Sequence, residues 1–324
     1  MSTTTLRVTP NERSPNSEHD VVLRVRGLVK RYGAITAVRD LDLDLYRGEV
    51  FGLLGPNGSG KSTTLGCVLG LIAPNHGRIE AFGFDLTRDR WEVLRRIGAI
   101  IETPALYGHL SGRDNLQALA ISVGGLPQGR IEELLDLVGL RERADDKFKT
   151  YSLGMKQRLG IASTLLTDPE LIILDEPTNG LDPAGQREVR NLIPRLAAEG
   201  RTVLLASHLL HDVEQVCDRI AILRRGEVLA VGGVGELLRT ERRFRISLSP
   251  AELAPAETIL RSMAGIAAIE QRDTSLVVNA PSLTGRDVNR ALSEAGIFAE
   301  ELRSEGASLE DYFLELTTEE TADA

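Results

Sequence analysis

The amino-acid sequence predicts an α/β fold with a mostly parallel core sheet, followed by a small α+β unit. An apolar strand over 50–54 runs into a Gly-rich loop and then a helix over 61–69. Two further apolar strands, 171–174 and 202–206, are separated by a helix over 186–198, and strands that alternate with helices pair in parallel. From residue 241 onward the strand and helix patterns start again in a different order.

Composition limits the class of protein. With 324 residues and 42% hydrophobic content, the chain has room for one large and one small domain. We expect a disordered tail over 1–20, a main domain over 21–240 and an accessory domain over 241–324. No apolar run approaches the roughly 18 residues that span a bilayer, and the start lacks the apolar core of a secretory signal, so we expect a cytoplasmic protein.

Charge and cysteine content exclude other classes. The formal net charge of −9 argues against a broad nucleic-acid interface, which needs a basic patch, and no nucleic-acid partner is expected. Cys67 and Cys217 lie far apart in the sequence. They are expected to be reduced core residues in place of a zinc site or a disulfide framework.

The remaining elements of the main domain follow from local patterns. Strict alternation over 41–45 predicts a half-exposed strand, and strand signals fade between 85 and 165, where we expect a helical insertion. Ser111 and Asp114 fit a capping box at the start of one of its helices. A hairpin is expected from 220 to 230.

The C-terminal unit has its own order of elements. We expect a strand over 244–248, a helix over 251–263, strands over 266–271 and 275–279, a helix over 285–294, a strand over 297–303 and a closing helix from Leu309. The order β-α-β-β-α-β predicts a ferredoxin-like plait.

One segment predicts that the chain binds a nucleoside triphosphate. It fits the pattern G-x-x-x-x-G-K-[ST] between a strand and a helix, which is the context that this motif requires. Glycines allow backbone N–H groups to surround the phosphates, the lysine reaches the terminal phosphates and the hydroxyl is suited to Mg²⁺. A Gly-rich surface turn is the alternative. The residues are Gly55, Pro56, Asn57, Gly58, Ser59, Gly60, Lys61, Ser62 and Thr63.

A pair of carboxylates follows the apolar strand over 171–174. Asp175 is suited to hold Mg²⁺, and Glu176 to orient and deprotonate the attacking water. The alternative is a strand that ends in acidic turn residues. Together with the phosphate loop, the pair predicts hydrolysis of the triphosphate.

The segment Tyr151-Ser152-Leu153-Gly154-Met155-Lys156-Gln157-Arg158 resembles the signature of the ATP-binding-cassette ATPases, the nucleotide-binding subunits of ABC transporters. It departs from the family pattern at three positions but keeps Ser152 and Gly154. The resemblance implies a P-loop ABC ATPase with an antiparallel β subdomain. It also implies a homodimer that sandwiches two ATP molecules, in which Ser152 and Gly154 face the γ-phosphate held by the opposite subunit.

Further motifs match this family in order. Tyr32 lies where an aromatic ring stacks on adenine, Asp182 where the D-loop links the two sites, and His208 where the switch histidine contacts the γ-phosphate. By themselves, Tyr32 would be an ordinary strand residue and His208 a core or surface histidine. The other histidines, His19, His76, His109 and His211, keep that ordinary interpretation.

Glu102 stands where the family usually carries a glutamine that touches Mg²⁺. A carboxylate is also an oxygen ligand, so Glu102 joins Ser62 and Asp175 as a candidate metal ligand; a solvated loop glutamate is the alternative. With the variant signature, it makes the chain similar to the bacitracin-export and lantibiotic-immunity ATPases, which pair with multi-span membrane permeases of the ABC-2 type. Residues 308–314 resemble their closing helix.

The resemblance therefore implies an ATPase that powers an exporter from the inner face of the cell membrane. Drug or peptide antibiotic is the expected cargo, with lipid, polysaccharide or ion as alternatives. A soluble ABC ATPase acting on nucleic acid or ribosomes is a second hypothesis, disfavoured because the chain lacks a long coiled-coil insertion, a cysteine cluster and a second cassette. A GTPase would need an N-K-x-D motif, which the sequence lacks. The C-terminal unit is expected to be regulatory, dimer-stabilising or merely structural.

Overall fold

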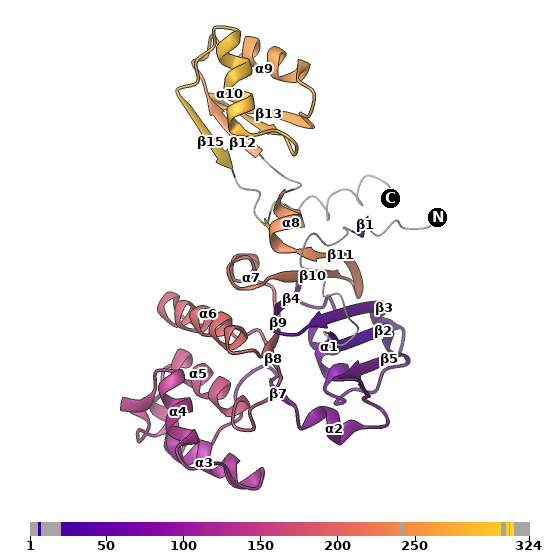
Figure 1. Ribbon diagram of the computed structural model, residues 1–324, viewed down its shortest axis with the longest axis vertical. Coiled ribbons are helices and arrows are strands. Elements are labelled where there is room, and N and C mark those ends of the chain that lie inside the picture. The colour runs from indigo at the N-terminus through magenta and orange to yellow at the C-terminus, as the bar shows by residue number, and fades with distance from the viewer. Residues whose placement is uncertain (1–5, 8–20, 240–242, 306–308, 311, 314–324) are drawn as a thin grey trace. The chain divides into compact units, whose positions relative to one another are not determined.

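The computed structural model describes residues 6–7, 21–239, 243–305, 309–310 and 312–313. The chain divides into two compact units, Met1–Gly232 and Gly233–Ala324, shown in Figure 1. Of the tail predicted over 1–20, only β1 (Leu6–Arg7) lies within the described residues, and it pairs in parallel with β11 (Glu227–Gly233).

The core of the first unit is a seven-stranded sheet in the order β1-β11-β10-β4-β9-β8-β7. Its centre consists of β4 (Val50–Leu54), β9 (Thr202–Ser207) and β8 (Leu171–Asp175), paired in parallel and buried at every residue. On the outer sides of these three strands, β10 (Arg219–Arg224) pairs in parallel with β4, and β7 (Ile97–Ile100) pairs in parallel with β8. The predicted α/β class with a mostly parallel sheet is confirmed.

Parallel pairing brings the carboxyl ends of the central strands to one edge of the sheet. There β4 leads into the Gly-rich loop and α1 (Lys61–Val68), β8 into Glu176, and β9 into His208. The helices α6 (Pro183–Ala198) and α7 (Leu210–Val216) follow β8 and β9 in the chain. Ligands of open parallel sheets bind at this edge.

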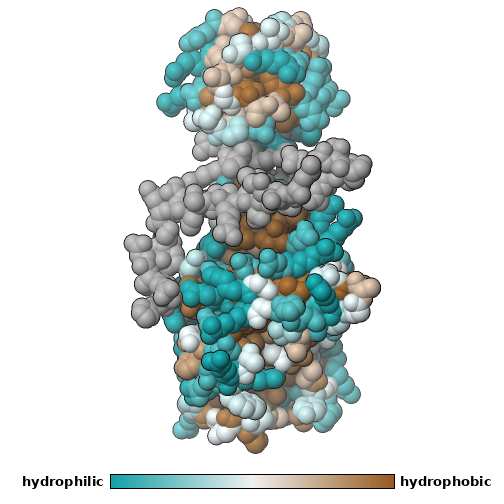
Figure 2. Space-filling model, turned by 90° about the vertical axis from the view of Figure 1, so that its right-hand side faces the viewer, coloured by the Kyte–Doolittle hydropathy of each residue, from teal (hydrophilic) through white to brown (hydrophobic). Residues whose placement is uncertain are grey.

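The predicted antiparallel subdomain is the four-stranded sheet β3-β2-β5-β6, formed by Ile35–Tyr46, Val21–Tyr32, His76–Ala81 and Phe84–Asp85. One hydrophobic core joins it to the parallel sheet: Val25 and Leu43 share a cluster with Phe51 and Leu53. Figure 2 looks onto this side of the unit, where hydrophilic residues predominate and smaller hydrophobic patches lie between them.

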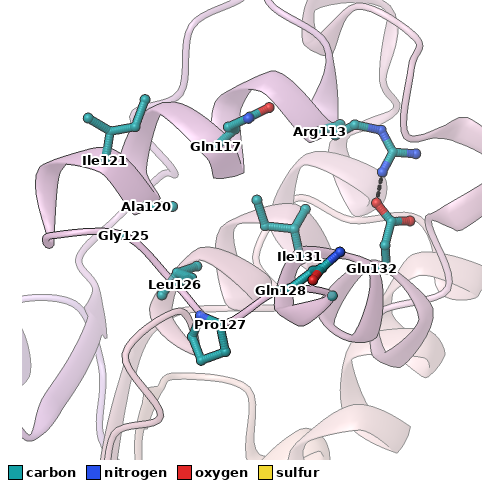
Figure 3. A pocket seen from close by; sticks show the side chains of 11 residues that line it. Arg113, Gln117, Ala120, Ile121, Gly125, Leu126, Pro127, Gln128, Ile131 and Glu132 are labelled. Carbon is teal, nitrogen blue, oxygen red and sulfur yellow. Dashed lines mark hydrogen bonds and ion pairs between the residues drawn. The ribbon is translucent and has the colours of Figure 1, made fainter.

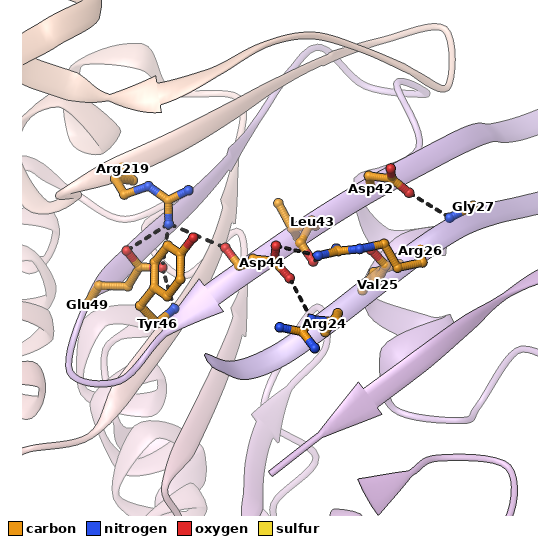
Figure 4. Close-up of polar contacts among 10 residues, drawn as sticks. All are labelled: Arg24, Val25, Arg26, Gly27, Asp42, Leu43, Asp44, Tyr46, Glu49 and Arg219. Carbon is orange, nitrogen blue, oxygen red and sulfur yellow. Dashed lines mark hydrogen bonds and ion pairs between the residues drawn. The ribbon is translucent and has the colours of Figure 1, made fainter. Parts of the chain in front are cut away.

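A partly buried ion pair also connects the two sheets (Figure 4). Arg219 Nη1 lies 3.0 and 3.1 Å from the carboxylate oxygens of Glu49 and donates to the Asp44 carbonyl at 3.3 Å. Burial raises the pKa of the Glu49 carboxyl, and the neighbouring guanidinium of Arg219 opposes that shift. The pair lies at the amino end of β4, the edge opposite the Gly-rich loop.

The segment predicted as a helical insertion contains α2 (Arg90–Leu94), α3 (Gly112–Ser122), α4 (Arg130–Leu137) and α5 (Leu153–Thr164), with 3₁₀ turns at Arg141–Arg143 and Phe148–Thr150. The predicted capping box is present, since Ser111 Oγ accepts from the Asp114 N–H at 3.0 Å. The prediction missed β7, which is only four residues long. A Cβ at Gly98 would lie 2.3 Å from the Thr164 carbonyl oxygen, so small residues there let α5 pack directly on the strand.

A pocket of about 360 Å³ lies between α3 and the start of α4 (Figure 3). Apolar side chains, including Ile121, Leu126 and Ile131, line it, and the ion pair between Arg113 and Glu132 lies at one side. None of its lining residues is a predicted site residue.

The second unit begins with α8 (Val234–Arg239) and continues with β12 (Arg243–Ser247), α9 (Leu253–Ser262), β13 (Ala268–Arg272), β14 (Ser275–Asn279), α10 (Gly285–Glu294) and β15 (Glu301–Glu305). Its antiparallel sheet has the order β13-β14-β12-β15, and the helices α9 and α10 share one core with the sheet. This confirms the ferredoxin-like plait. Of the closing helix predicted from Leu309, residues 309, 310, 312 and 313 are described and helical; the rest lies outside the described residues.

Candidate functional site

The phosphate-loop glycines occupy positions that only glycine fits. Gly58 and Gly60 have φ values of 81° and 108°, in the left-handed region. A Cβ at Gly55 would lie 2.2 Å from the Leu223 carbonyl oxygen, and one at Gly60 would lie 2.5 Å from that of Ala37. The loop is therefore held against β3 and β10 by main-chain packing, which the motif alone did not reveal.

Lys61, the first residue of α1, folds back over this loop. Its Nζ donates to the Gly55 carbonyl at 2.7 Å and to the Pro56 carbonyl at 3.3 Å. The same atom lies 3.3 Å from Glu176 Oε1, and the two side chains are only 5% and 19% exposed. The ammonium therefore lies at the phosphate loop with two carbonyls and one carboxylate around it, and it shares its charge with that carboxylate.

Asp175, the last residue of β8, is 2% exposed. Burial raises the pKa of its carboxyl; the hydrogen bond from Ser62 and the charge of Lys61 oppose this shift, and the charges of Glu176 and Glu102 add to it. Among the described residues its Oδ1 has no hydrogen-bond partner. A buried carboxylate oxygen beside a hydroxyl fits a small divalent cation.

No three His, Cys, Asp or Glu side chains gather as a metal-binding group anywhere in the described part of the chain. A cation at Asp175 would therefore take most of its ligands from hydroxyl, phosphate and water oxygens. Mg²⁺ is bound in this way in many phosphate sites.

Glu176 has three partners: Lys61, Ala206 and His208. Its φ is 48°, an uncommon left-handed conformation for a glutamate, and its N–H donates to the Ala206 carbonyl at 2.9 Å. Its Oε2 lies 2.8 Å from His208 Nδ1 and accepts from the His208 N–H at 3.3 Å. The structure thus brings Lys61, Ser62, Asp175, Glu176 and His208 together at one edge of the sheet.

Ser152, Gly154 and Asp182 form a second group. Ser152 caps α5 by accepting from the Met155 N–H at 3.2 Å, and Asp182 caps α6 by accepting from the Gly185 N–H at 3.1 Å. A Cβ at Gly154 would lie 3.2 Å from Gly185 Cα, so the two helix starts touch. Within the described chain, no hydrogen bond or ion pair joins this group to the phosphate loop.

Tyr32 and Glu102 lie around the first group. Tyr32 ends β2, is 48% exposed, and has Lys30 Nζ 4.9 Å from its ring centroid. It pairs with Ile35 across the hairpin whose Ala37 carbonyl packs against Gly60, so this hairpin connects Tyr32 to the phosphate loop. Glu102 follows β7 with a φ of 62°, and its charge is felt at Asp175.

Comparison with known proteins identifies the class. A family model described as ABC transporter matches residues 38–179. Two relatives align over 92% of the chain: the uncharacterised ABC transporter ATP-binding protein YdbJ of Bacillus subtilis at 38% identity and a bacitracin transport ATP-binding protein at 35%. The chain therefore belongs to the ABC transporter family, and it is an ATP-binding, ATP-hydrolysing subunit of a transporter.

Two relatives that carry functional names align with almost the whole chain. The chain is 35% identical to the bacitracin transport ATP-binding protein BcrA of Enterococcus faecalis, over 92% of this chain and 96% of BcrA. It is 38% identical to the daunorubicin resistance ATP-binding protein DrrA3 of Streptomyces coeruleorubidus, over the same shares of the two chains. A solved ATP-binding subunit of an ABC transporter superposes with a TM-score of 0.60 at 34% identity, covering 67% of this chain and 92% of that one.

None of the helices among the described residues has both the length and the hydrophobicity to cross a bilayer.

Proposed function

We propose that this chain powers the export of a drug or peptide antibiotic through separate membrane permease subunits, from the inner face of the cell membrane. The observation that carries the proposal is the contact of Glu176 with both Lys61 and His208 beside the buried Asp175. The relatives named for bacitracin transport and daunorubicin resistance, which align over almost the whole chain, support the cargo class.

In this proposal, each residue in and around the first group has a role. Backbone N–H groups of the phosphate loop and Lys61 bind the phosphates, and Tyr32 stacks on the base. Glu176 takes a proton from the water that attacks the γ-phosphorus, while the bond to ADP breaks and inorganic phosphate leaves. His208 holds Glu176 through Nδ1, which leaves its Nε2 for the γ-phosphate.

Ser62, Asp175 and Glu102 are the residues that would hold Mg²⁺. When bound, this ion neutralises phosphate charge during the transfer. Two features support this assignment: Oδ1 of Asp175 has no partner among the described residues, and the Asp175 carboxylate accepts a hydrogen bond from Ser62.

A second copy completes the site in this proposal. Ser152 and Gly154 lie at the start of the twelve-residue helix α5, whose positive end attracts an anion. Because they form a group of their own, apart from the phosphate loop, we assign them to the γ-phosphate of the partner copy. Asp182, beside them, then connects the two sites, and ATP joins the homodimer.

Exposed apolar side chains are available for the permease. Trp91 is 81% exposed, Tyr107 58% and Leu71 67%. Trp91 belongs to α2, which packs on β7, the strand that leads to Glu102. A permease that contacts α2 would thereby act close to the nucleotide.

The experiment is to express the chain together with its neighbouring permease gene in a sensitive host. We expect resistance to a peptide antibiotic or drug, co-purification of the permease from membranes, and loss of resistance with Glu176→Gln. Recovery of the chain without any multi-span protein would contradict the exporter and favour the soluble ATPase.

The second unit is proposed to regulate the ATPase or to stabilise its dimer. It follows a complete ATPase and has its own core. Removing residues 240–324 should therefore change the ATPase rate, dimerisation or transport. If the ATPase rate, dimerisation and transport all stay unchanged, the second unit is a purely structural appendage.

A further inference from the structure

The helix α7 carries no site residue itself but begins two residues after His208. With seven residues it is too short to be stable alone, because isolated helices under about 12 residues are marginal in water. Its place, and with it the place of His208, must come from contacts with neighbouring elements. Two such contacts are well defined.

The first contact is with β4, the strand that leads to the phosphate loop. Gly52 of β4 leaves room for α7: a Cβ there would lie 3.0 Å from Val213 Cγ1 and 2.9 Å from Cys217 Sγ. Val213 is fully buried. This apolar contact fixes how closely α7 approaches the sheet, but it does not fix its position along α6.

The second contact is an ion pair with α6. Arg190 Nη1 lies 2.9 Å from Asp212 Oδ1, and the two side chains are 18% and 6% exposed. Asp212 lies in the first turn of α7, four residues after His208. Its other oxygen, Oδ2, is buried and has no hydrogen-bond partner in the described chain.

Stability alone is a weak reason for such a pair. A buried ion pair often contributes no more than well-packed apolar residues would, whereas its directional bond selects one arrangement of the two helices. Arg190 lies eight residues after Asp182, about 12 Å along α6 from the residue that caps it. The pair thus connects α6, which Asp182 caps, with α7, which follows His208.

We propose that Arg190 is a positioning residue for hydrolysis: through Asp212 it sets α7, and thereby His208 Nδ1, against Glu176. The proposal rests on the roles given above to His208 and Glu176. Arg190 touches no reacting atom in this scheme. It also provides a rigid connection from Asp182 to His208 within one copy.

The test is the double variant Arg190→Met with Asp212→Leu, which replaces the pair by apolar side chains and leaves no charge buried alone. We expect folding close to that of the wild type, the KM for ATP unchanged within about twofold, and kcat lower by about tenfold or more, as expected for a misplaced catalytic group. The imidazole resonances of His208, assigned with His208→Ala, should shift.

The matched control is Arg219→Met with Glu49→Leu. This pair is also an arginine–carboxylate pair and is partly buried, but it lies at the opposite end of β4. We expect it to affect stability at most and to leave kcat and the His208 resonances unchanged. In a His208→Ala background, the Arg190 and Asp212 substitutions should cause no further loss of kcat, because effects that act through one group are not additive.

Wild-type kcat together with unchanged His208 resonances would overturn the proposal and make the pair structural. Additive losses in the His208→Ala background would also overturn it. If the double variant does not fold, kcat and the His208 resonances are measured in Asp212→Asn, which keeps the shape of the side chain. The same two results then support or overturn the proposal. Normal hydrolysis by Glu176→Gln and by His208→Ala would instead contradict the proposed function. In that case the shift of the His208 resonances in the Arg190 and Asp212 double variant would still show whether the ion pair positions His208.

Discussion

The ammonium of Lys61 and the carboxylate of Glu176 lie 3.3 Å apart. One residue belongs to the phosphate loop and the other follows the central strand β8, so two motifs distant in sequence share a charge pair. Because both side chains are largely shielded from water, this attraction is stronger than at the surface. An incoming phosphate must therefore compete with Glu176 for Lys61.

Competition of this kind predicts that Glu176→Gln increases the affinity for ATP measured without Mg²⁺, where hydrolysis cannot contribute. We expect Kd to fall about fivefold, the equivalent of about 1 kcal/mol for a partly shielded charge pair. Titration calorimetry measures it. The control is Glu102→Gln, which also removes a charge near Asp175 but has no contact with Lys61; an equal effect of both variants would contradict the competition.

With Mg²⁺ present, Glu176→Gln is expected to bind ATP, to lose turnover by about 10² or more, and to accumulate as a nucleotide-locked dimer, because the group that accepts the proton is gone. Phosphate release and light scattering measure these effects. Hydrolysis near the wild-type rate would remove Glu176 from its assigned role.

The composite site predicts complementation between two inactive chains. Lys61→Ala should destroy the phosphate loop and Ser152→Ala the signature, each with large loss of activity. In an equal mixture, half of the dimers contain one intact composite site, so we expect about a quarter of the wild-type rate for independent sites. A mixture as inactive as its components would place both groups within one copy.

Packing around the phosphate loop predicts the effect of a single methyl group. Gly55→Ala would force its Cβ to within 2.2 Å of the Leu223 carbonyl oxygen, so we expect a loss of stability of about 1–3 kcal/mol and loss of ATP binding. Denaturant unfolding measures it. Gly235→Ala, which meets nothing within 4 Å, is the control and should be nearly neutral.

The two cysteines should be inert in the folded protein. Both are buried, and burial raises the pKa of the Cys67 and the Cys217 thiols above the ordinary value. At pH 8, below these pKa values, both remain protonated thiols, and the thiolate is the reactive form. We expect alkylation by iodoacetamide, followed by mass spectrometry, only after denaturant is added; modification of the native chain would contradict the burial.

Much of this architecture is readable from the sequence because motifs and strand patterns are local. The phosphate loop and the Asp175-Glu176 pair each stand directly after an apolar strand, and parallel pairing then brings them together. The strand over 97–100 escaped prediction because Gly98 and Ala99 carry no strand signal; the close approach of α5 explains the glycine at 98.

Contacts that depend on tertiary packing escaped as well. No pattern indicates that Ala37 and Leu223 support the phosphate loop through carbonyl groups, since any residue offers a carbonyl. The pairing of Arg190 with Asp212 joins two helices through ordinary surface-type residues, and only the fold makes them buried.

The separate cores of the two units determine how any melting experiment must be read. Each unit has its own cluster of buried side chains, and among the described residues these two clusters share no member. Heating should therefore give two calorimetric transitions, of which only the one belonging to the ATPase unit rises with added nucleotide. A single apparent midpoint for the whole chain would average the two transitions, so the free energy of each variant must be assigned to the transition of the unit that carries it.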